Sequence, residues 1–162
     1  MPATNISGTA VTVVYYPPSS GNPHCILSNI GGNTAYVGQS GISSATGLPV
    51  PPNDRAKLLF AGGTIYATAG FTQVSPYGTA NAATTYPGGS VLTVNSAGTA
   101  FGTGSTIVVE PGTPRQEIAV VFATNAGTVT TTAAFTFGHP NSSVFSAINP
   151  LATTVRAERG TA

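Results

Sequence analysis

The stretch "SNIGGNTAYVGQSG", residues 28–41, places four glycines among fourteen residues, with Gly31-Gly32 a few residues before Tyr36. Glycine clusters can bind phosphate, present a nucleophilic serine or turn the chain. A phosphate-binding loop requires a Gly-Lys-Ser/Thr ending, and the only lysine, Lys57, lies outside the stretch. A dinucleotide site requires a helix after the glycines, whereas a strand pattern follows here. The segment "GQSGI" (38–42) has Ile42 where a nucleophile elbow requires glycine.

The remaining interpretation is a turn between two β-strands, 24–30 and 34–39. Gly38 and Gly41 then end the second strand and begin a loop. Similar short β-branched and aromatic runs recur along the chain between turn residues, and the chain contains 20 Gly and 13 Pro. Gly62-Gly63 between two such runs indicates a hairpin. The remaining expected strands span 9–16, 56–61, 64–70, 71–76, 90–96, 105–111, 116–123, 128–135 and 143–148.

These patterns predict an all-β fold of two small β-sandwich or β-barrel units joined by a Gly/Ala/Thr-rich linker. The N-terminal β-sandwich unit spans residues 1–76, and the linker spans 77–87. A small β-barrel-like unit spans 88–149. Residues 150–162 are expected to form a C-terminal tail, either a solvated arm or a short helix. Each unit is near the lower size limit for a self-sufficient core, which favours packing against a partner.

Charged residues make up only 6% of the chain, and the net charge is +1. The charges are scattered along the sequence, so we expect no basic stripe for nucleic acid and no basic face for a membrane. No apolar run is long enough to span a membrane, and no signal peptide is visible. A net charge near zero favours association, which suggests a component of an assembly.

Residues with catalytic or metal-binding chemistry are few. Neighbouring residues on a strand point to opposite faces, so His24 and Cys25 are not expected to pair. The two acids Glu110 and Glu117 could meet across a hairpin, where Arg115 would form a local ion pair. We therefore expect no enzyme, no catalytic residues, no cofactor and no metal site.

The segment "CILSNIGGNTAYVGQSGISSATGLPVPP" (25–52), followed by "AGGTIYATAG" (61–70), resembles a segment of virion proteins from tailed phages, especially phages of actinobacteria. The family positions filled here are Asn29, Gly32, Tyr36, Val37, Gly38, Ser40, Gly41, Gly47, Pro49 and Pro52. A second segment from "SVLTVNSAGTAF" (90–101) onward resembles a small β-module of such proteins. Glu117 and His139 occupy that module's Glu and His positions.

The resemblance implies a structural virion protein on the outside of the capsid, without a cofactor. The first hypothesis is a decoration or cement protein bound to the major capsid protein. The alternatives are a host-surface carbohydrate adhesion module and a minor tail or fibre subunit. The absence of Trp disfavours a sugar platform, and the absence of repeats or heptads disfavours a long fibre.

The segment "TAVTVVYYPP" (9–18) carries apolar residues on both strand faces, although a strand in a thin sandwich needs only one. The surplus suggests contact with a partner, and burial in a two-sided core is the alternative. The interface candidates are Val11, Val13, Tyr15, Tyr16, Arg156 and Arg159. A homo-oligomer is expected, with a trimer favoured, because three-fold positions of a capsid repeat each weak contact three times.

Overall fold

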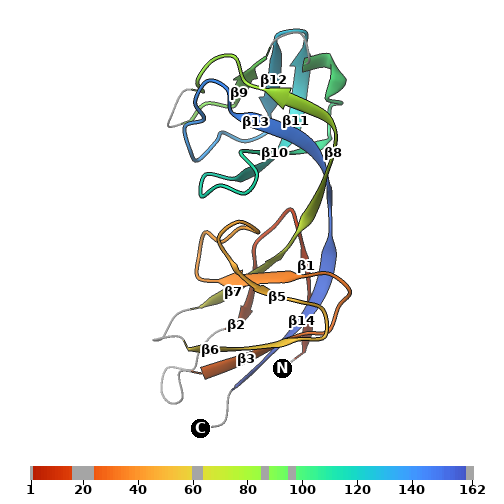
Figure 1. Ribbon diagram of the computed structural model, residues 1–162, viewed down its shortest axis with the longest axis vertical. Helices are drawn as coiled ribbons and strands as arrows, with labels where there is room; N and C mark the ends of the chain where they lie inside the picture. The colour runs from red at the N-terminus through yellow and green to blue at the C-terminus, as the bar shows by residue number, and fades with distance from the viewer. Residues whose placement is uncertain (1, 16–23, 60–63, 85–87, 95–97, 160–162) are drawn as a thin grey trace. The chain divides into compact units, whose positions relative to one another are not determined.

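The computed structural model describes residues 2–15, 24–59, 64–84, 88–94 and 98–159 (Figure 1). Within these ranges, the regular structure consists of β-strands and one short 3₁₀ turn, Gly98–Ala100. The expected all-β class is therefore confirmed. The strands form three sheets, and the chain divides into two compact units. Unit 1 contains residues 1–71 and 150–162, and unit 2 contains residues 72–149.

Unit 1 is a sandwich of two four-stranded antiparallel sheets. Sheet A has the order β1 (Ala3–Ser7), β14 (Ala152–Arg159), β3 (His24–Asn29) and β6 (Arg55–Leu59). Sheet B has the order β2 (Thr12–Tyr15), β7 (Ile65–Ala69), β4 (Ala35–Gly38) and β5 (Leu48–Val50). Both sheets contribute to one apolar core, which includes Leu27 and Val155 from sheet A and Val37 and Ile65 from sheet B.

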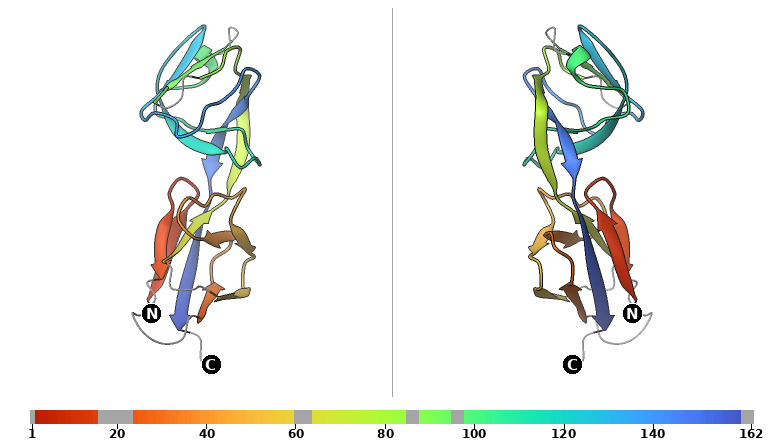
Figure 2. Two further views of the ribbon diagram at one scale, coloured as in Figure 1. Left: turned by 90° about the vertical axis from the view of Figure 1, so that its left-hand side faces the viewer. Right: turned by 90° about the vertical axis from the view of Figure 1, so that its right-hand side faces the viewer.

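The first and last strands of the chain lie side by side in sheet A (Figure 2). The expected C-terminal tail is therefore wrong, because its residues form β14 between β1 and β3. The inward side chains of β14 are Thr153, Val155 and Ala157, all of them buried. Two of these three are small or polar, so the strand carries little of the apolar alternation that marks a half-buried strand.

The opening glycine stretch forms the expected turn between β3 and β4, but these strands belong to different sheets. Asn29, at the end of β3, is 1% exposed. Its amide nitrogen donates to the main-chain oxygens of Asn33 and Val50, each at 2.8 Å. Its amide oxygen accepts from the Gly31 N–H at 3.1 Å and the Thr153 hydroxyl at 2.9 Å. One side chain therefore joins both sheets.

Glycine is required at position 31 because the turn passes very close to β14. A Cβ at this position would collide with the Thr153 side chain and with the main-chain nitrogen of Thr154. The main-chain nitrogens of Ile30 and Gly31 both donate to the Thr154 oxygen, at 2.9 and 3.1 Å. The glycine therefore lets the turn pack directly on β14.

Strand β2 explains the apolar surplus of residues 9–18 in part. Its pairing with β7 shifts register between Val13 and Tyr15, as in a β-bulge. Val14 and Tyr15 are consequently both buried, at 9% and 4% exposure, although they are neighbours. Both residues belong to the single core of unit 1, so their burial comes from the bulge and not from a separate core on each face of the strand.

Unit 2 is a six-stranded sheet with the order β8 (Phe71–Thr79), β13 (Val144–Pro150), β10 (Thr106–Val109), β11 (Glu117–Asn125), β12 (Thr128–Thr131) and β9 (Val91–Thr93). A bridge between Ala80 and Val94 connects the chain after β8 to the chain after β9, which closes the sheet on itself. Phe101 and Phe145 meet in its core, with ring centroids 4.9 Å apart.

The chain passes between the units within β8 and β13 rather than through a loop. Residues 77–79 of the expected linker belong to β8, and Ala80 makes the closing bridge. The Thr84 N–H also donates to the His139 oxygen at 2.8 Å. The described part of that segment is therefore an integral part of unit 2. The Gly62-Gly63 hairpin lies outside the described residues.

We predict that Asn29→Asp lowers the free energy of unfolding of unit 1 by at least about 2 kcal/mol. The carboxylate cannot donate, so the main-chain oxygens of Asn33 and Val50, the second of them buried, lose the hydrogen bonds from this side chain. The Cys25 thiol reports the change, because burial, opposed in part by a hydrogen bond to the Glu158 backbone, raises its pKa to about 11. Ellman's reagent should therefore modify the variant in less urea than the wild type.

Asn5→Asp is the matched control, since Asn5 is exposed on β1 and its side-chain oxygen still accepts from the Thr154 hydroxyl. Equal Cys25 modification curves for Asn29→Asp and the wild type would contradict the role assigned to the Asn29 amide.

Candidate functional site

The most concentrated chemistry in unit 2 is a polar cluster of Glu110, Arg115, Glu117, His139 and Ser143. Glu110 directly follows β10 and Glu117 begins β11, so the two carboxylates stand at the same end of a strand pair. His139 and Ser143 lie on the segment that leads into β13. These four side chains are buried or nearly so, whereas Arg115 is half exposed.

His139 occupies the centre of this polar cluster and is 0% exposed. Its Nε2 lies 2.9 Å from Glu117 Oε2, and its Nδ1 lies 3.5 Å from Glu110 Oε1. An ionised carboxylate can only accept, so Nε2 carries a proton and donates to Glu117. Nδ1 has no hydrogen-bond partner among the described atoms. The Phe135 ring packs edge-on at 5.0 Å and covers the imidazole.

Glu110 is bound on both carboxylate oxygens. Arg115 donates from Nε to Oε2 at 2.9 Å, and the Ser143 hydroxyl donates to Oε1. Burial alone would raise the pKa of Glu110, but Ser143, Arg115 and His139 together hold this pKa below its ordinary value. The carboxylate is therefore stabilised in its ionised form.

The loop between β10 and β11 positions these groups. Glu110 and Gly112 have φ values of 50° and 78°, in the left-handed region that few side-chain-bearing residues adopt. The Thr113 hydroxyl donates to the Glu110 main-chain oxygen at 3.0 Å, and the Gly112 N–H donates to Gln116 Oε1 at 2.9 Å. These local bonds hold the turn that brings Arg115 back to Glu110, which confirms the expected ion pair.

Glu117 binds a third segment. Its carboxylate accepts from the main-chain nitrogens of Thr136 and Phe137, at 2.6 and 2.9 Å. The polar cluster therefore connects the β10–β11 turn with the long segment between β12 and β13. The imidazole is enclosed and both carboxylates are hydrogen-bonded, so this arrangement stabilises the fold of unit 2.

The polar cluster contains all the Asp, Glu, Lys, Arg and His residues of unit 2. Unit 2 therefore presents a surface whose polarity comes almost wholly from uncharged groups. The sequence expectation missed His139, because the ring's acidic neighbours lie 22 residues away or more in the chain. The resemblance to phage virion proteins did single out Glu117 and His139, whose side chains lie within hydrogen-bond distance at 2.9 Å.

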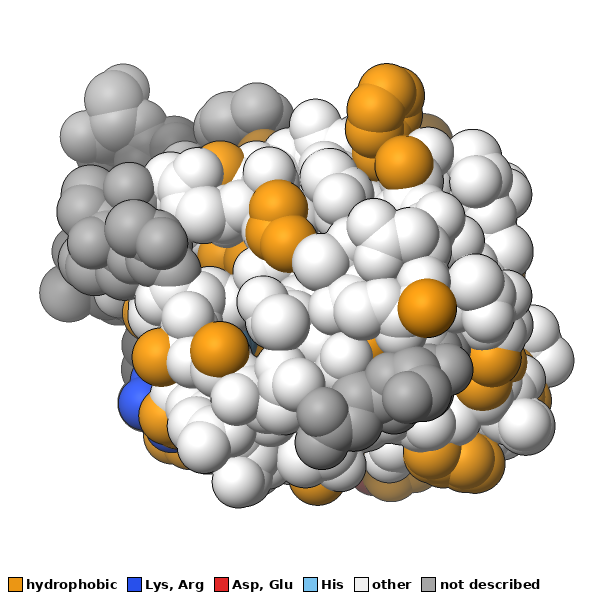
Figure 3. Space-filling view, turned by 90° about the horizontal axis from the view of Figure 1, so that it is seen from above, with side chains coloured by type: hydrophobic (Ala, Val, Ile, Leu, Met, Phe, Trp, Pro, Cys, Tyr) orange, Lys and Arg blue, Asp and Glu red, His pale blue; other side chains and the backbone are white. Residues whose placement is uncertain are grey.

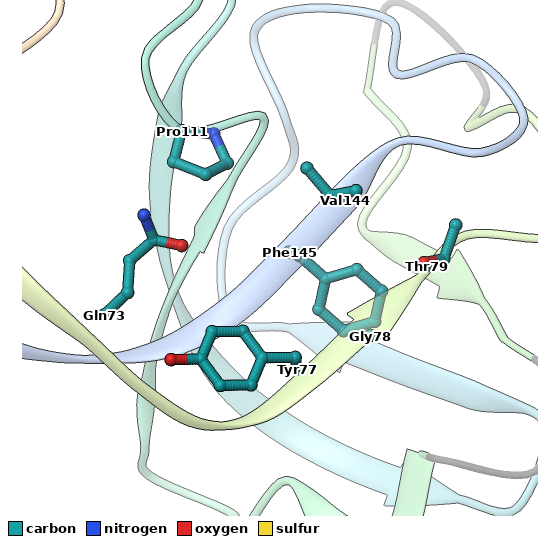
Figure 4. A pocket seen from close by; sticks show the side chains of 7 residues that line it. All are labelled: Gln73, Tyr77, Gly78, Thr79, Pro111, Val144 and Phe145. Carbon is teal, nitrogen blue, oxygen red and sulfur yellow. The ribbon is translucent and has the colours of Figure 1, made fainter.

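A pocket of about 420 Å³ also lies on unit 2 (Figure 4). Strand β8 contributes Gln73, Tyr77, Gly78 and Thr79; β13 contributes Val144 and Phe145; and Pro111 comes from the loop after β10. A Cβ on Gly78 would lie 2.5 Å from Phe145 Cζ, so the glycine lets that ring lie against β8. Tyr77 and Val144 are 63% and 53% exposed. The pocket therefore presents two large apolar side chains to solvent.

The structure divides the expected interface residues between the two sheets of unit 1. Val11, just before β2, is 44% exposed, and Val13 is half-buried in β2. Tyr15 belongs to the core and Tyr16 lies outside the described residues. Arg156 is exposed on β14, whereas Arg159 ends that strand and its side chain is not described. Sequence reasoning missed Tyr77 and Val144, since exposure of single apolar residues has no sequence signal.

Among the described residues, no group of three or more His, Cys, Asp and Glu side chains is arranged to hold a metal ion. None of the described helical segments has the length and apolar character needed to cross a membrane. Comparison with known proteins finds no family model, no curated protein and no solved structure that matches this chain.

We predict that Glu110→Gln lowers the free energy of unfolding of unit 2 by about 2 kcal/mol, because it removes one charge from a largely buried ionic group. The figure is moderate since the Arg115 side chain is 50% exposed and water already screens it. Urea unfolding followed through the amide signals of β10 and β13 measures the effect. Glu158→Gln, at an exposed site on β14, should leave those signals unchanged; equal midpoints for the two variants would refute the assignment.

We also predict an acid dependence that Glu110→Gln reduces. The folded pKa of Glu110 is lowered from its ordinary value of 4.5, so its contribution to stability is fully present above that pH. The contribution declines as the pH falls below 4.5 and is lost once the folded form is protonated. Urea midpoints measured from pH 7 to pH 3 should fall more steeply in the wild type. Parallel curves would exclude the ionised Glu110 as a source of stability.

Proposed function

We propose that this chain is a structural protein of a phage particle that binds the major capsid protein on the outside of the head. The class comes from the resemblance of residues 24–72 and of the later β-module to virion proteins. The surface of unit 2 supports the proposal. Its ionisable groups are bound to one another and to the main chain, so the side chains left for contact with a partner are mostly uncharged. We assign it no catalytic role.

The observation that carries the proposal is the set of large apolar side chains exposed on a surface with few charges. Tyr77 and Phe122 are each 63% exposed. Figure 3 shows one face on which apolar and uncharged polar side chains predominate, with only a small Lys or Arg patch at its edge. The remaining exposed members of the set are Val11, Ile30, Leu48, Val91, Val120, Phe137 and Val144. Burial of such side chains contributes about 25 cal/mol per Å² of apolar area, so contacts with a partner are favourable without ion pairs.

The oligomer that we propose is a homotrimer at three-fold positions of the capsid. Contacts made by single exposed side chains are individually weak, and simultaneous engagement of several copies raises their combined affinity. Light scattering of the isolated protein, alone and with purified capsids, measures the mass. A monomer in solution together with density on five-fold axes would exclude this arrangement.

One feature favours the alternative of a host-surface adhesion module. The exposed Tyr77 ring and the Gln73 side chain line the same pocket (Figure 4). An aromatic surface with a hydrogen-bonding amide is an arrangement that binds sugars. Binding of host-wall polysaccharide to the isolated protein, with no binding to capsids, would favour this function over the first.

Labelling the C-terminus with gold and imaging purified particles tests the proposed function directly. Label distributed over the head is the expected result. Label confined to the tail or absent from intact particles would reject a capsid location.

We predict that Tyr77→Asp reduces capsid occupancy at least tenfold while the amide spectrum of unit 2 is retained. The side chain is exposed, so the fold tolerates the change, but a carboxylate buried without a partner costs several kcal/mol at an apolar contact. Thr103→Asp adds the same charge at an exposed polar site before β10, outside the apolar set, and is the matched control. Undiminished occupancy of Tyr77→Asp would remove this surface from the interface.

A further inference from the structure

The outer face of sheet A gathers most of the charged side chains of unit 1. On β14 the outward residues are Arg156 and Glu158, and on β6 they are Arg55 and Lys57, all of them exposed. Between these strands lies β3, whose outward Ile26 and Ser28 are half-buried. Three of the five cations in the chain therefore stand on one face of sheet A, which we call the cationic face.

The register of the strands places these residues in two rows. Arg156 and Arg55 both pair with Ser28, one from each side. Glu158 and Lys57 both pair with Ile26 in the same way. Neighbouring strands lie about 4.8 Å apart, so the two arginine Cα atoms are roughly 10 Å from each other. The residue between the two arginines is Ser28, whose side chain is small and half-buried.

These charges are not used within the described structure. The ion pairs found among the described residues all lie in the polar cluster of unit 2. The formal charge of the cationic face is three positive and one negative, which gives +2. Asp54, exposed just before β6, accepts from the Arg55 N–H at 2.7 Å and reduces the local sum to +1. The arginine side chains themselves remain available.

We propose that the cationic face binds an acidic patch on another protein, with one carboxylate seated over Ser28 between Arg55 and Arg156. Guanidinium groups present a planar set of donors that matches a carboxylate, and the Ser28 hydroxyl supplies a further donor. The inference rests on the proposed function only in requiring a protein partner, and it adds the chemistry that the partner must show.

The composition of the face distinguishes a protein from other anionic partners. Nucleic acid binders typically neutralise six to ten phosphates, whereas three cations are available here. Glu158 stands on β14 two residues from Arg156 and across Ile26 from Lys57, where it repels the uniform negative charge of a phosphate backbone or an anionic lipid surface. A folded protein can place a carboxylate opposite the arginines and a neutral or basic group opposite Glu158. Ile26 and the exposed Ile30 add the apolar contacts usual in protein interfaces.

The test uses the full chain labelled with ¹⁵N and two blocked hexapeptides, Asp-Thr-Asp-Thr-Asp-Thr and its counterpart with Asn in place of Asp. An extended peptide places alternate side chains on one side, at the spacing of the face. The acidic peptide should shift the amide signals of Ser28, Arg55 and Arg156, and the Asn peptide should shift none of them. Shifts elsewhere, or none, overturn the proposal.

Two variants with opposite expected signs separate charge recognition from structural damage. Arg156→Gln should weaken binding of the acidic peptide roughly two- to fivefold, the range for one exposed ion pair. Glu158→Gln should tighten it by a similar factor, because it removes the repelling carboxylate. If both variants weaken binding, the charge assignment is wrong. If Arg156→Gln does not fold, Glu158→Gln alone tests the proposal: tighter binding of the acidic peptide supports it, and weaker or unchanged binding overturns it.

A DNA duplex and vesicles containing phosphatidylserine serve as competing anions. Tighter binding of either than of the acidic peptide would replace the protein partner with a phosphate-bearing one and overturn the proposal. The peptide experiment needs no capsid. A negative result there rejects the cationic face as a binding site, whereas undiminished capsid occupancy of Tyr77→Asp bears on the proposed function.

Discussion

The Asn29 amide is the contact on which unit 1 depends. A sandwich must fix the relative position of its two sheets, and apolar side chains alone do so without direction. Asn29 adds four directed hydrogen bonds, which connect β3 with β5, β14 and the glycine turn. Because it is 1% exposed, none of these bonds exchanges readily with water. The neighbouring Gly31 allows the turn close enough to β14 for the bonds to form.

Local patterns predicted the class and most strands, because turn chemistry and β-branched runs act over a few residues. The expected strands 24–30, 34–39 and 64–70 correspond closely to β3, β4 and β7. The pattern missed β1 and β14, since their pairing joins opposite ends of the chain. Small inward residues such as Ala157 are buried there by their neighbours rather than by their own hydrophobicity. The domain boundary at 77–87 was misplaced for a related reason: a segment without large aliphatic residues can still complete a strand.

In the polar cluster too, the sequence predicted the local contact but not the distant one. Arg115 and Glu110 are five residues apart, and the turn between them was visible in the sequence. His139 reaches Glu117 from 22 residues away, which only the tertiary fold brings about. The sequence shows the charges as scattered, because it does not reveal which distant residues share a face of a sheet. Arg55 and Arg156 flank the same serine although about 100 residues separate them, because β3 lies between their strands.

A chain with 6% charged residues can still use charge for specificity if the fold sorts the charges by role. In unit 2 every ionisable group of the Asp, Glu, Lys, Arg and His types enters one cluster, which leaves apolar contacts to supply binding energy in proportion to area. In unit 1 the charges stand on an open face, where they affect partner choice and encounter rate more than affinity. The function that we propose therefore gives the units complementary tasks. Unit 2 supplies apolar contact with the partner, and unit 1 selects the partner surface by charge.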